Sequence, residues 1–100
     1  MARRRQSLES AAHALDLVLA AIAHPARRQI LLALKFRDGT MTAGEIAARF
    51  ECAWPTTTRH LKVLLAAGLV KRSRRGRQIE YRVEERALRA IHEQWLKYFG

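Results

Sequence analysis

A short capped helix, a turn and a longer helix follow one another over about residues 42–67, and this spacing limits the possible folds more than any other feature. Thr42 and Glu45 form a capping box, in which the Thr42 hydroxyl accepts from the Glu45 N–H and the Glu45 carboxylate reaches back to Thr42. The short helix that begins here ends near Phe50. Pro55 then opens the longer helix, because proline suits a first helical turn.

Two extended runs come directly after Gly68, which is typical of a left-handed helix cap. The runs are Leu69–Ser73 and Gln78–Val83, and a turn rich in arginine and containing Gly76 joins them. The second run alternates apolar and polar residues, so we predict a β-hairpin. A short helix, a turn and a longer helix form a helix-turn-helix, and a hairpin behind it is a wing. The sequence therefore predicts a winged helix-turn-helix, with the helix-turn-helix at about 42–67 and the wing at about 69–83.

Helices are predicted on both sides of this motif. Leu8, Leu15, Leu19 and Ile22 recur at helical spacing, and a second helix starts at about Pro25. A last helix begins near Glu84–Glu85 and carries an apolar stripe that reaches Tyr98. Residues 1–7 are polar and basic, and we expect a flexible tail there. The fold class is mainly α with a small β-hairpin, in one domain over residues 8–100.

The first and last helices carry more apolar surface than one small domain can cover, because small domains bury a limited share of their surface. Two copies packed about a two-fold axis would bury these stripes against each other. We therefore predict a homodimer through the first and last helices, with the interface formed by Leu8, Leu15, Leu19, Leu88, Ile91, Trp95 and Tyr98. Such a dimer would place two reading helices about one DNA turn apart, on a near-palindromic site.

The charge of the chain points to a polyanionic partner. Nineteen Lys and Arg stand against nine Asp and Glu, which gives a net charge of +10. No acidic residue occurs from Cys52 to Ile79, the span of the longer helix and most of the wing. A basic surface of this kind suits phosphate contacts. The longest apolar stretch, Ala11–Ala23, contains His13 and Asp16 and is too short to span a bilayer. We expect a cytoplasmic, nucleoid-associated protein and no membrane partner.

Candidate DNA-binding residues follow from the faces of the longer helix. Thr57, Leu61, Leu64 and Leu65 share the core face. The residues expected to meet DNA are Trp54, Thr56, Thr58, Arg59 and Lys62 on the helix, and Arg72, Arg74, Arg75 and Arg77 on the wing. Arg59 is the first candidate for base reading, because guanidinium takes O6 and N7 of guanine together. The threonines suit phosphates or thymine methyls, and the wing arginines suit the backbone or minor groove.

Several segments of this sequence resemble the corresponding segments of the ArsR family of regulators. The resemblance covers roughly residues 15–98 and rests on Ala23–Leu31, Thr42–Ala47, Pro55–Leu64, Ala67–Val70, Arg75–Arg77 and Tyr81–Val83. It implies a winged-helix homodimer formed by the first and last helices, which represses transcription and is released from DNA by a signal. The end of the chain, with Trp95 and Tyr98, is more similar to a metal-independent branch of the family.

Two positions depart from the family pattern. Ala53 stands where the family usually has a Ser or Thr that caps the recognition helix, which leaves backbone N–H groups free to receive a DNA phosphate. Trp54 stands where a polar base-contacting residue is common. Its side chain either packs on the sugar-phosphate backbone or folds onto the turn as part of the core, and we favour the core.

The residues give little support for a metal site, a cofactor or catalysis. Cys52 is the one cysteine, so a site with several thiolates within one chain is excluded, and it is either a buried turn residue or a redox sensor. The last helix offers His92 and Glu93, with Glu85 a turn or more away, so we predict no metal and no cofactor. Residues for nucleophilic catalysis or a phosphate loop are missing, so no enzyme activity is expected.

Three functions fit a basic winged helix. The first is a sequence-specific regulator of double-stranded DNA, and we expect it to be a repressor. The second is a non-specific architectural protein of the nucleoid. The third is a module for RNA or an acidic protein, which the motif disfavours because the major groove of A-form RNA is too narrow for a helix. Only a high ratio of specific to non-specific binding separates the first from the second.

Overall fold

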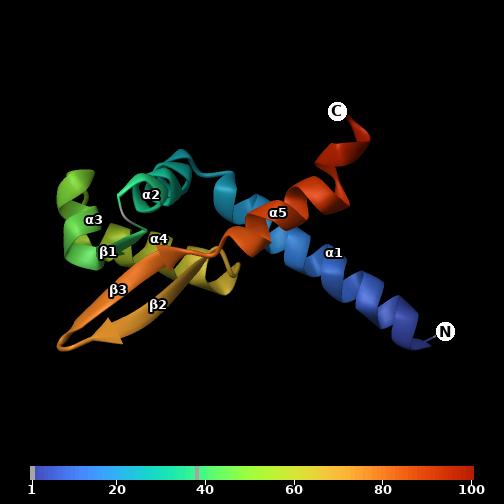
Figure 1. Cartoon of the computed structure of the whole chain (residues 1–100), viewed down its shortest axis with the longest axis horizontal. Helices are drawn as coiled ribbons and strands as arrows, with labels where there is room; N and C mark the ends of the chain where they lie inside the picture. The colour runs from blue at the N-terminus through green and yellow to red at the C-terminus, as the bar shows by residue number, and fades with distance from the viewer. Residues whose placement is uncertain (1, 38) are drawn as a thin grey trace.

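A computed structural model describes the backbone of residues 2–37 and 39–100 and the side chains of residues 8–37 and 39–100. The elements, in chain order, are α1 (Ala2–Ile22), α2 (Pro25–Phe36), β1 (Thr40–Thr42), α3 (Ala43–Arg49), α4 (Trp54–Ala66), β2 (Val70–Arg75), β3 (Gln78–Val83), α5 (Glu85–Gln94) and the short 3₁₀ helix η1 (Leu96–Tyr98). Helices dominate, and a small antiparallel sheet completes the winged helix-turn-helix (Figure 1). The predicted fold class is confirmed.

Helix α1 starts earlier than the sequence suggested. The predicted flexible tail covered residues 1–7, whereas the helix begins at Ala2 and continues to Ile22. Met1 and the side chains of residues 2–7 lie outside the described part. The apolar spacing that marked the helix starts only at Leu8, because the preceding residues are polar and carry no period.

The helix-turn-helix forms as its local signals predict. The Thr42 hydroxyl accepts from the Glu45 N–H at 3.1 Å, and the Glu45 carboxylate accepts from the Thr42 N–H at 3.0 Å. These hydrogen bonds lower the pKa of Glu45. In the turn, Glu51 adopts a left-handed backbone with φ 51°, and the N–H of Cys52 donates to the Ala47 carbonyl at 2.9 Å. This bond closes the end of α3 and directs the chain into α4.

The sheet has three strands in the order β1-β3-β2, with both pairs antiparallel. The hairpin β2–β3 was predicted, although β2 runs from Val70 to Arg75 and not from Leu69 to Ser73. The strand β1 was missed, because three residues are too few to show alternation. Met41 pairs with Tyr81 and is 1% exposed, so β1 fastens the wing to the core.

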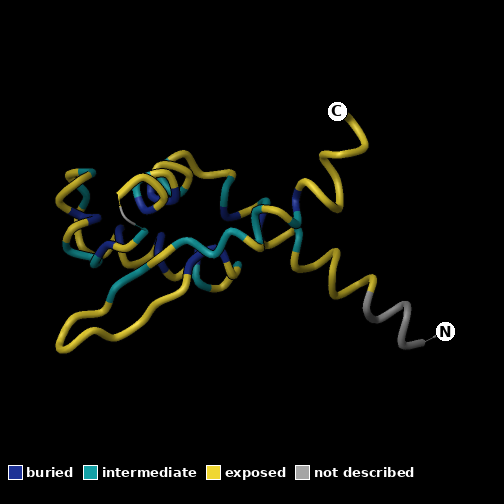
Figure 2. The backbone as a smooth tube through the Cα atoms, in the orientation of Figure 1, coloured by how far each residue is buried: buried dark blue, intermediate teal, exposed yellow. Residues whose placement is uncertain are grey.

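The core lies where the helices and the base of the sheet meet (Figure 2). Its buried apolar side chains are Val18, Ala21, Ile30, Leu31, Leu34, Met41, Ile46, Leu61, Leu64, Leu69, Val70 and Ile91. Ile91 was predicted at the dimer interface and is a core residue of the protomer, 7% exposed. Sequence periodicity marks it as apolar but does not distinguish these two kinds of burial.

The long helix α1 and the C-terminal end of the chain extend away from this body on the side opposite the wing tip (Figure 1). The predicted helical stripe through Tyr98 is interrupted at Trp95, whose backbone leaves the helical region at φ −146° and ψ −61°. The Trp95 and Phe99 rings then pack with centroids 5.1 Å apart. Helices α1 and α5 thus join the core through Val18, Ala21 and Ile91, and beyond the core they form, with η1, an extension with exposed apolar side chains, which we call the apolar extension.

Candidate nucleic-acid interface

One face of α4 is exposed over its N-terminal half. All five predicted contact residues of this helix are exposed: Trp54, Thr56, Thr58, Arg59 and Lys62. The opposite face is in the core, where Thr57 is 1%, Leu61 2% and Leu64 0% exposed. Thr57 donates its hydroxyl to the Ala53 carbonyl at 3.1 Å, which satisfies the buried oxygen. The helix therefore presents threonine and arginine to solvent over the N-terminal half, which enters a major groove in this fold, and Lys62 just beyond its middle.

The start of α4 has no side-chain cap. Ala53 is the N-cap residue, with φ −64° and ψ 146°, and no side chain accepts from the first N–H groups. The positive end of the helix dipole is thus open next to Trp54 and Thr56. This geometry agrees with the prediction for Ala53, and it favours an anion at this point.

Trp54 is a surface residue, so the expectation that it belongs to the core is wrong. Its side chain is 59% exposed, and its ring lies over Gly44 of α3. It borders an open cleft of about 490 Å³ between α3, α4 and the wing, lined also by Thr58, Arg77 and Ile79. Ile79 is 46% exposed. The cleft thus combines apolar walls with a cation and a hydroxyl, which suits a deoxyribose-phosphate strand.

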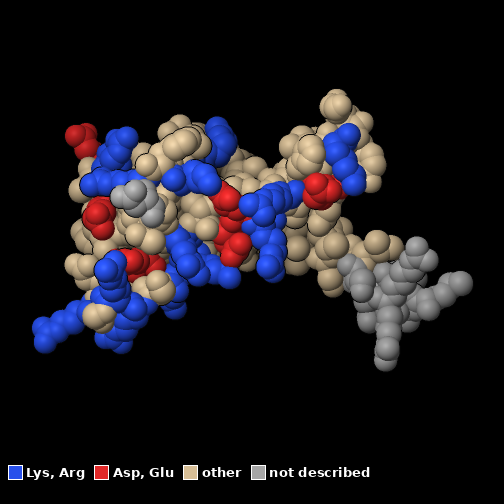
Figure 3. Space-filling model, viewed as in Figure 1, with Lys and Arg blue, Asp and Glu red and all other residues tan. Residues whose placement is uncertain are grey.

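The wing carries a dense basic surface. Arg72, Arg74, Arg75 and Arg77 are all exposed, and Lys and Arg side chains gather over the hairpin (Figure 3). Gly76 turns the chain with φ 62°, and Arg74 Nε donates to its carbonyl at 3.3 Å. Arg75 Nη1 lies 3.8 Å from Glu80, so its charge is partly balanced.

His60 lies behind this surface, on the buried face of α4. It is 7% exposed, and its ring packs against His24 with centroids 4.6 Å apart. Arg27 Nη1 is 3.4 Å from His60 Nδ1, and Arg27 Nε donates to the Ala21 carbonyl at 2.6 Å. Burial, followed by repulsion from His24, Arg27 and Arg59, lowers the pKa of His60. A neutral His60 thereby links α4 to α2 and the end of α1.

Apart from Ile91, which is in the core, the predicted dimer residues fall into two groups. Leu8, Trp95 and Tyr98 are 65%, 49% and 71% exposed, whereas Leu15, Leu19 and Leu88 are half-buried against the protomer's own core. Sequence reasoning missed three further exposed apolar side chains nearby: Leu17, Leu96 and Phe99. Their apolar character was the available signal, but no single helical period joins them.

The remaining predictions concern metals, redox chemistry and membranes. Among the described residues, no group of three or more His, Cys, Asp and Glu side chains is placed to hold a metal ion. Cys52 is half-buried in the turn after α3. Within the described part of the chain, no single helix has the length and apolarity to cross a membrane, and one pair, Leu8–Ile22 with Pro25–Phe36, passes that test together but is bent by 93°.

Comparison with known proteins identifies the motif. A family model described as "Helix-turn-helix domain" matches residues 22–73. The biofilm growth-associated repressor of Agrobacterium fabrum is 36% identical over 86 residues, which cover 85% of this chain and 72% of that protein. The transcriptional repressor SdpR of Bacillus subtilis is 42% identical over 64 residues, covering 64% of this chain and 69% of its own.

Solved structures give the same answer for the fold. A crystal structure of an ArsR family transcriptional regulator is 29% identical, with a TM-score of 0.75 and 86% of each chain covered. The homodimeric winged helix-turn-helix DNA-binding domain of a possible ArsR-family regulator from Mycobacterium bovis is 25% identical, with a TM-score of 0.70 over 95% of this chain and 84% of that one. These similar proteins are regulators, and the chain is not an enzyme. It belongs to the ArsR family of winged helix-turn-helix transcriptional regulators.

Proposed function

We propose that the chain represses transcription by binding a near-palindromic DNA operator as a homodimer. The observation that carries this proposal is the acid-free span from Cys52 to Ile79, which folds into the exposed face of α4 and most of the wing. A surface with one sign of charge over both DNA-facing elements suits phosphate binding. Similar proteins from Agrobacterium fabrum and Bacillus subtilis carry the name repressor, which supports the direction of regulation.

The roles of individual residues follow from their positions. Arg59 reads a base edge in the major groove, because it is exposed on the N-terminal half of α4. Thr56 and Thr58 contact phosphates or thymine methyls, and Lys62, farther along the helix, holds a phosphate. The wing residues Arg72, Arg74, Arg75 and Arg77 contact the backbone or minor groove beside it.

The dimer in this proposal forms through the apolar extension of α1, α5 and η1. Several large apolar side chains of leucine, tryptophan, tyrosine and phenylalanine are exposed there. Burying them between two copies removes apolar surface from water and so stabilises the dimer. The similar domain from Mycobacterium bovis is homodimeric, which supports the same arrangement here. Two copies would then present two α4 helices about one DNA turn apart. We expect the protein in the cytoplasm, associated with the nucleoid through DNA.

The test is binding of the full chain to sheared genomic DNA at physiological salt, followed by sequencing of the retained fragments. We expect a few sharp peaks that share an inverted repeat. Diffuse enrichment would overturn the repressor proposal and favour a non-specific architectural protein.

A single variant then tests the reading helix on the recovered operator. We expect Arg59→Ala to weaken operator binding by about 1–3 kcal/mol and to relax the preference at one base position. Arg37→Ala removes an exposed positive charge at the end of α2, outside α4, the wing and the proposed dimer elements, and serves as the matched control. Equal effects of the two variants would contradict a role for Arg59 in base reading.

A further inference from the structure

Two cavities meet at one ion pair between α2 and the start of α5. The larger, of about 620 Å³, is bordered by the cations Lys35, Arg82, Arg86 and Arg89. The smaller, of about 310 Å³, lies between α2 and α5. Lys35, Val83 and Glu85 line both, so these side chains form a shared wall. The volumes fall within or near the range of small-molecule sites, about 300–1,000 Å³.

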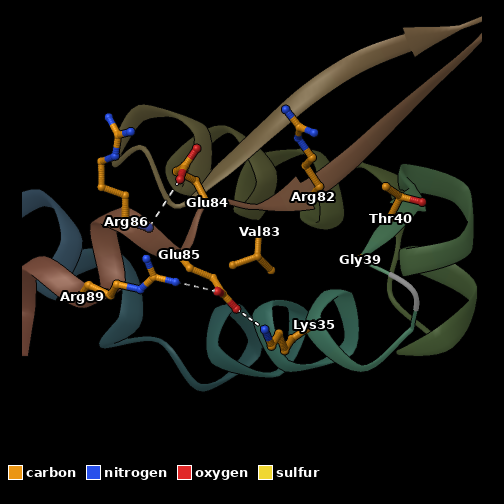
Figure 4. Close-up of a pocket in the computed structure, with 9 residues that line it drawn as sticks. All are labelled: Lys35, Gly39, Thr40, Arg82, Val83, Glu84, Glu85, Arg86 and Arg89. Carbon is orange, nitrogen blue, oxygen red and sulfur yellow. Dashed lines mark hydrogen bonds and ion pairs between the residues drawn. The ribbon is translucent and has the colours of Figure 1, made fainter.

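The wall is a carboxylate held by two cations. Glu85 Oε1 pairs with Lys35 Nζ, and Glu85 Oε2 lies 3.4 Å from Arg89 Nη2. These side chains point toward one another in Figure 4. Lys35 and Arg89 lower the pKa of Glu85, which keeps it ionised near neutral pH. The second acid here, Glu84, is engaged by Lys71 at 2.9 Å. The Glu85 carboxylate therefore lies between two cations, in a position that another anion could take.

The smaller cavity is apolar. Its lining side chains are Ile22, Leu31, Leu32 and Leu88, with Val83 at the wall and Arg28 at the rim. Leu32 is 48% exposed, so the cavity is accessible from solvent. Arg28 Nη1 donates to the Ile22 and Ala23 carbonyls at 2.7 and 3.1 Å, which fixes this rim. An apolar group therefore has a place immediately beside a site for a carboxylate.

We propose that the two cavities form one binding site for a small organic carboxylate with an apolar body. The apolar body fills the space between Leu31, Leu32 and Leu88. The ligand carboxylate displaces Glu85 from Lys35 and Arg89, and Glu85 moves into the larger cavity, where Arg82 and Arg86 offer positive charge. One carboxylate replaces another, so the exchange leaves the cations paired.

The position of the site gives it a regulatory use, which rests on the proposed DNA-binding function. Val83 ends the wing strand β3, Glu85 begins α5, and Lys35 belongs to α2. Releasing Glu85 from Lys35 removes a contact between α2 and α5, the helix we assign to the dimer. A ligand that binds better to the released arrangement changes operator affinity by its difference in affinity for the two arrangements.

The probe is octanoate, titrated into DNA-free full-length protein by calorimetry, with octanamide and acetate as matched controls. Octanamide keeps the apolar body without the charge, and acetate keeps the charge without the body. We expect one octanoate per protomer and at least tenfold weaker binding of both controls. Lys35→Met removes the cation and is expected to weaken octanoate binding at least tenfold.

Two further variants test the direction in which octanoate affinity changes when an acid is removed. Glu85→Gln removes the internal competitor, so we expect octanoate to bind several-fold more tightly. Glu93→Gln removes an acid from the same helix outside both cavities and is expected to leave binding unchanged. Circular dichroism establishes that each variant is folded.

Several outcomes would overturn the site. These are octanoate binding to neither the wild type nor Glu85→Gln, equal binding of octanamide, and weaker binding by folded Glu85→Gln. Operator binding is measured separately on ligand-free protein. Failure of the ligand site therefore leaves the DNA-binding proposal standing, and failure of operator binding leaves the octanoate result standing.

Discussion

The indole of Trp54 lies so close to Gly44 that a Cβ atom on Gly44 would be 3.3 Å from two of its ring atoms, Cζ2 and Cη2. Gly44 is in the first turn of α3, and Trp54 is the first residue of α4. The two helices of the helix-turn-helix therefore meet at a glycine and an exposed aromatic ring. This contact sets how far the ring stands out toward the cleft between α4 and the wing.

The first prediction is that Gly44→Ala raises the stability of the fold while it lowers the affinity for DNA. Alanine favours the helix by about 0.5–1 kcal/mol, and the exposed ring is able to shift by a few tenths of an ångström. We expect unfolding at a higher denaturant concentration but weaker operator binding, because Trp54 is displaced in the cleft. Chemical denaturation and fluorescence anisotropy measure the two effects.

The control for Gly44→Ala is Ala48→Gly, at an exposed position of α3 away from Trp54. We expect Ala48→Gly to lower the stability of the fold and to leave operator affinity unchanged. Unchanged operator affinity of Gly44→Ala would show that Trp54 has no part in the DNA contact.

A second prediction concerns Glu51, which holds φ 51° in the turn between α3 and α4. A residue with a Cβ pays about 1–2 kcal/mol in this region, and glycine does not. We expect Glu51→Gly to stabilise the fold by up to about 1 kcal/mol, since glycine's greater freedom in the unfolded chain offsets part of the gain. Glu51→Ala keeps the strain and removes the charge, so it should show no such gain in thermal unfolding. An equal gain in both variants would assign the effect to the charge.

Much of the helix-turn-helix was predictable because its signals are local. Thr42 and Glu45 are three residues apart and cap α3, and Gly68 adopts φ 73° after α4 as expected. The strand β1 was not predictable, because Met41 pairs with Tyr81 far along the chain. Pairing at that separation depends on the assembled fold.

The burial of His60 was open to prediction and was missed. Thr57, His60, Leu61 and Leu64 follow one helical face, and all four are buried. The polarity of histidine hid this regular spacing. The surroundings of His60 were not predictable, because His24 and Arg27 come from a distant helix start.

The third prediction uses the lowered pKa of His60. The unfolded chain binds a proton at this residue near pH 6.5, whereas the folded chain does so only at lower pH. As far as His60 is concerned, the free energy of unfolding is therefore highest above about pH 6.5. It decreases as the pH drops from there through the pKa of His60 in the folded chain. Denaturation at steps from pH 7.5 to 5.0 measures this. The lowered pKa values of Glu45, Glu84 and Glu85 act below their ordinary value of 4.5, outside this window.

His60→Gln keeps a hydrogen-bonding side chain near Arg27 but does not titrate, so we expect the loss between pH 6.5 and 5.0 to become smaller. His13→Gln replaces an exposed histidine on α1 and should retain the wild-type profile. A profile that is unchanged in His60→Gln would assign the titration to another group.

The fourth prediction tests the dimer through Trp95, which is 49% exposed. Full burial of such a side chain contributes about 1.5–3 kcal/mol, and each residue occurs twice in a symmetric interface. Because about half of Trp95 is already buried within the protomer, we expect Trp95→Glu to weaken association roughly 10- to 10²-fold, seen as a shift toward monomer by light scattering over a range of protein concentrations. Phe36→Glu, on α2 and 81% exposed in wild type, is the control for introducing a charge at an exposed aromatic. A dimer that survives Trp95→Glu and dissociates in Phe36→Glu would place the interface on α2.

The last prediction compares two arginines of the wing. Arg77 borders the cleft beside Trp54, whereas Arg75 lies 3.8 Å from Glu80 and is partly neutralised. Each phosphate contact contributes about 0.9 to the slope of log affinity against log salt concentration, because bound cations are released. We expect Arg77→Ala to reduce that slope by about 1, and Arg75→Ala to reduce it by less. Anisotropy titrations on the operator between low and physiological salt give both slopes. If Arg75→Ala has the larger effect, Arg75 leaves Glu80 to bind phosphate and the tip of the wing, more than the cleft, holds the DNA strand.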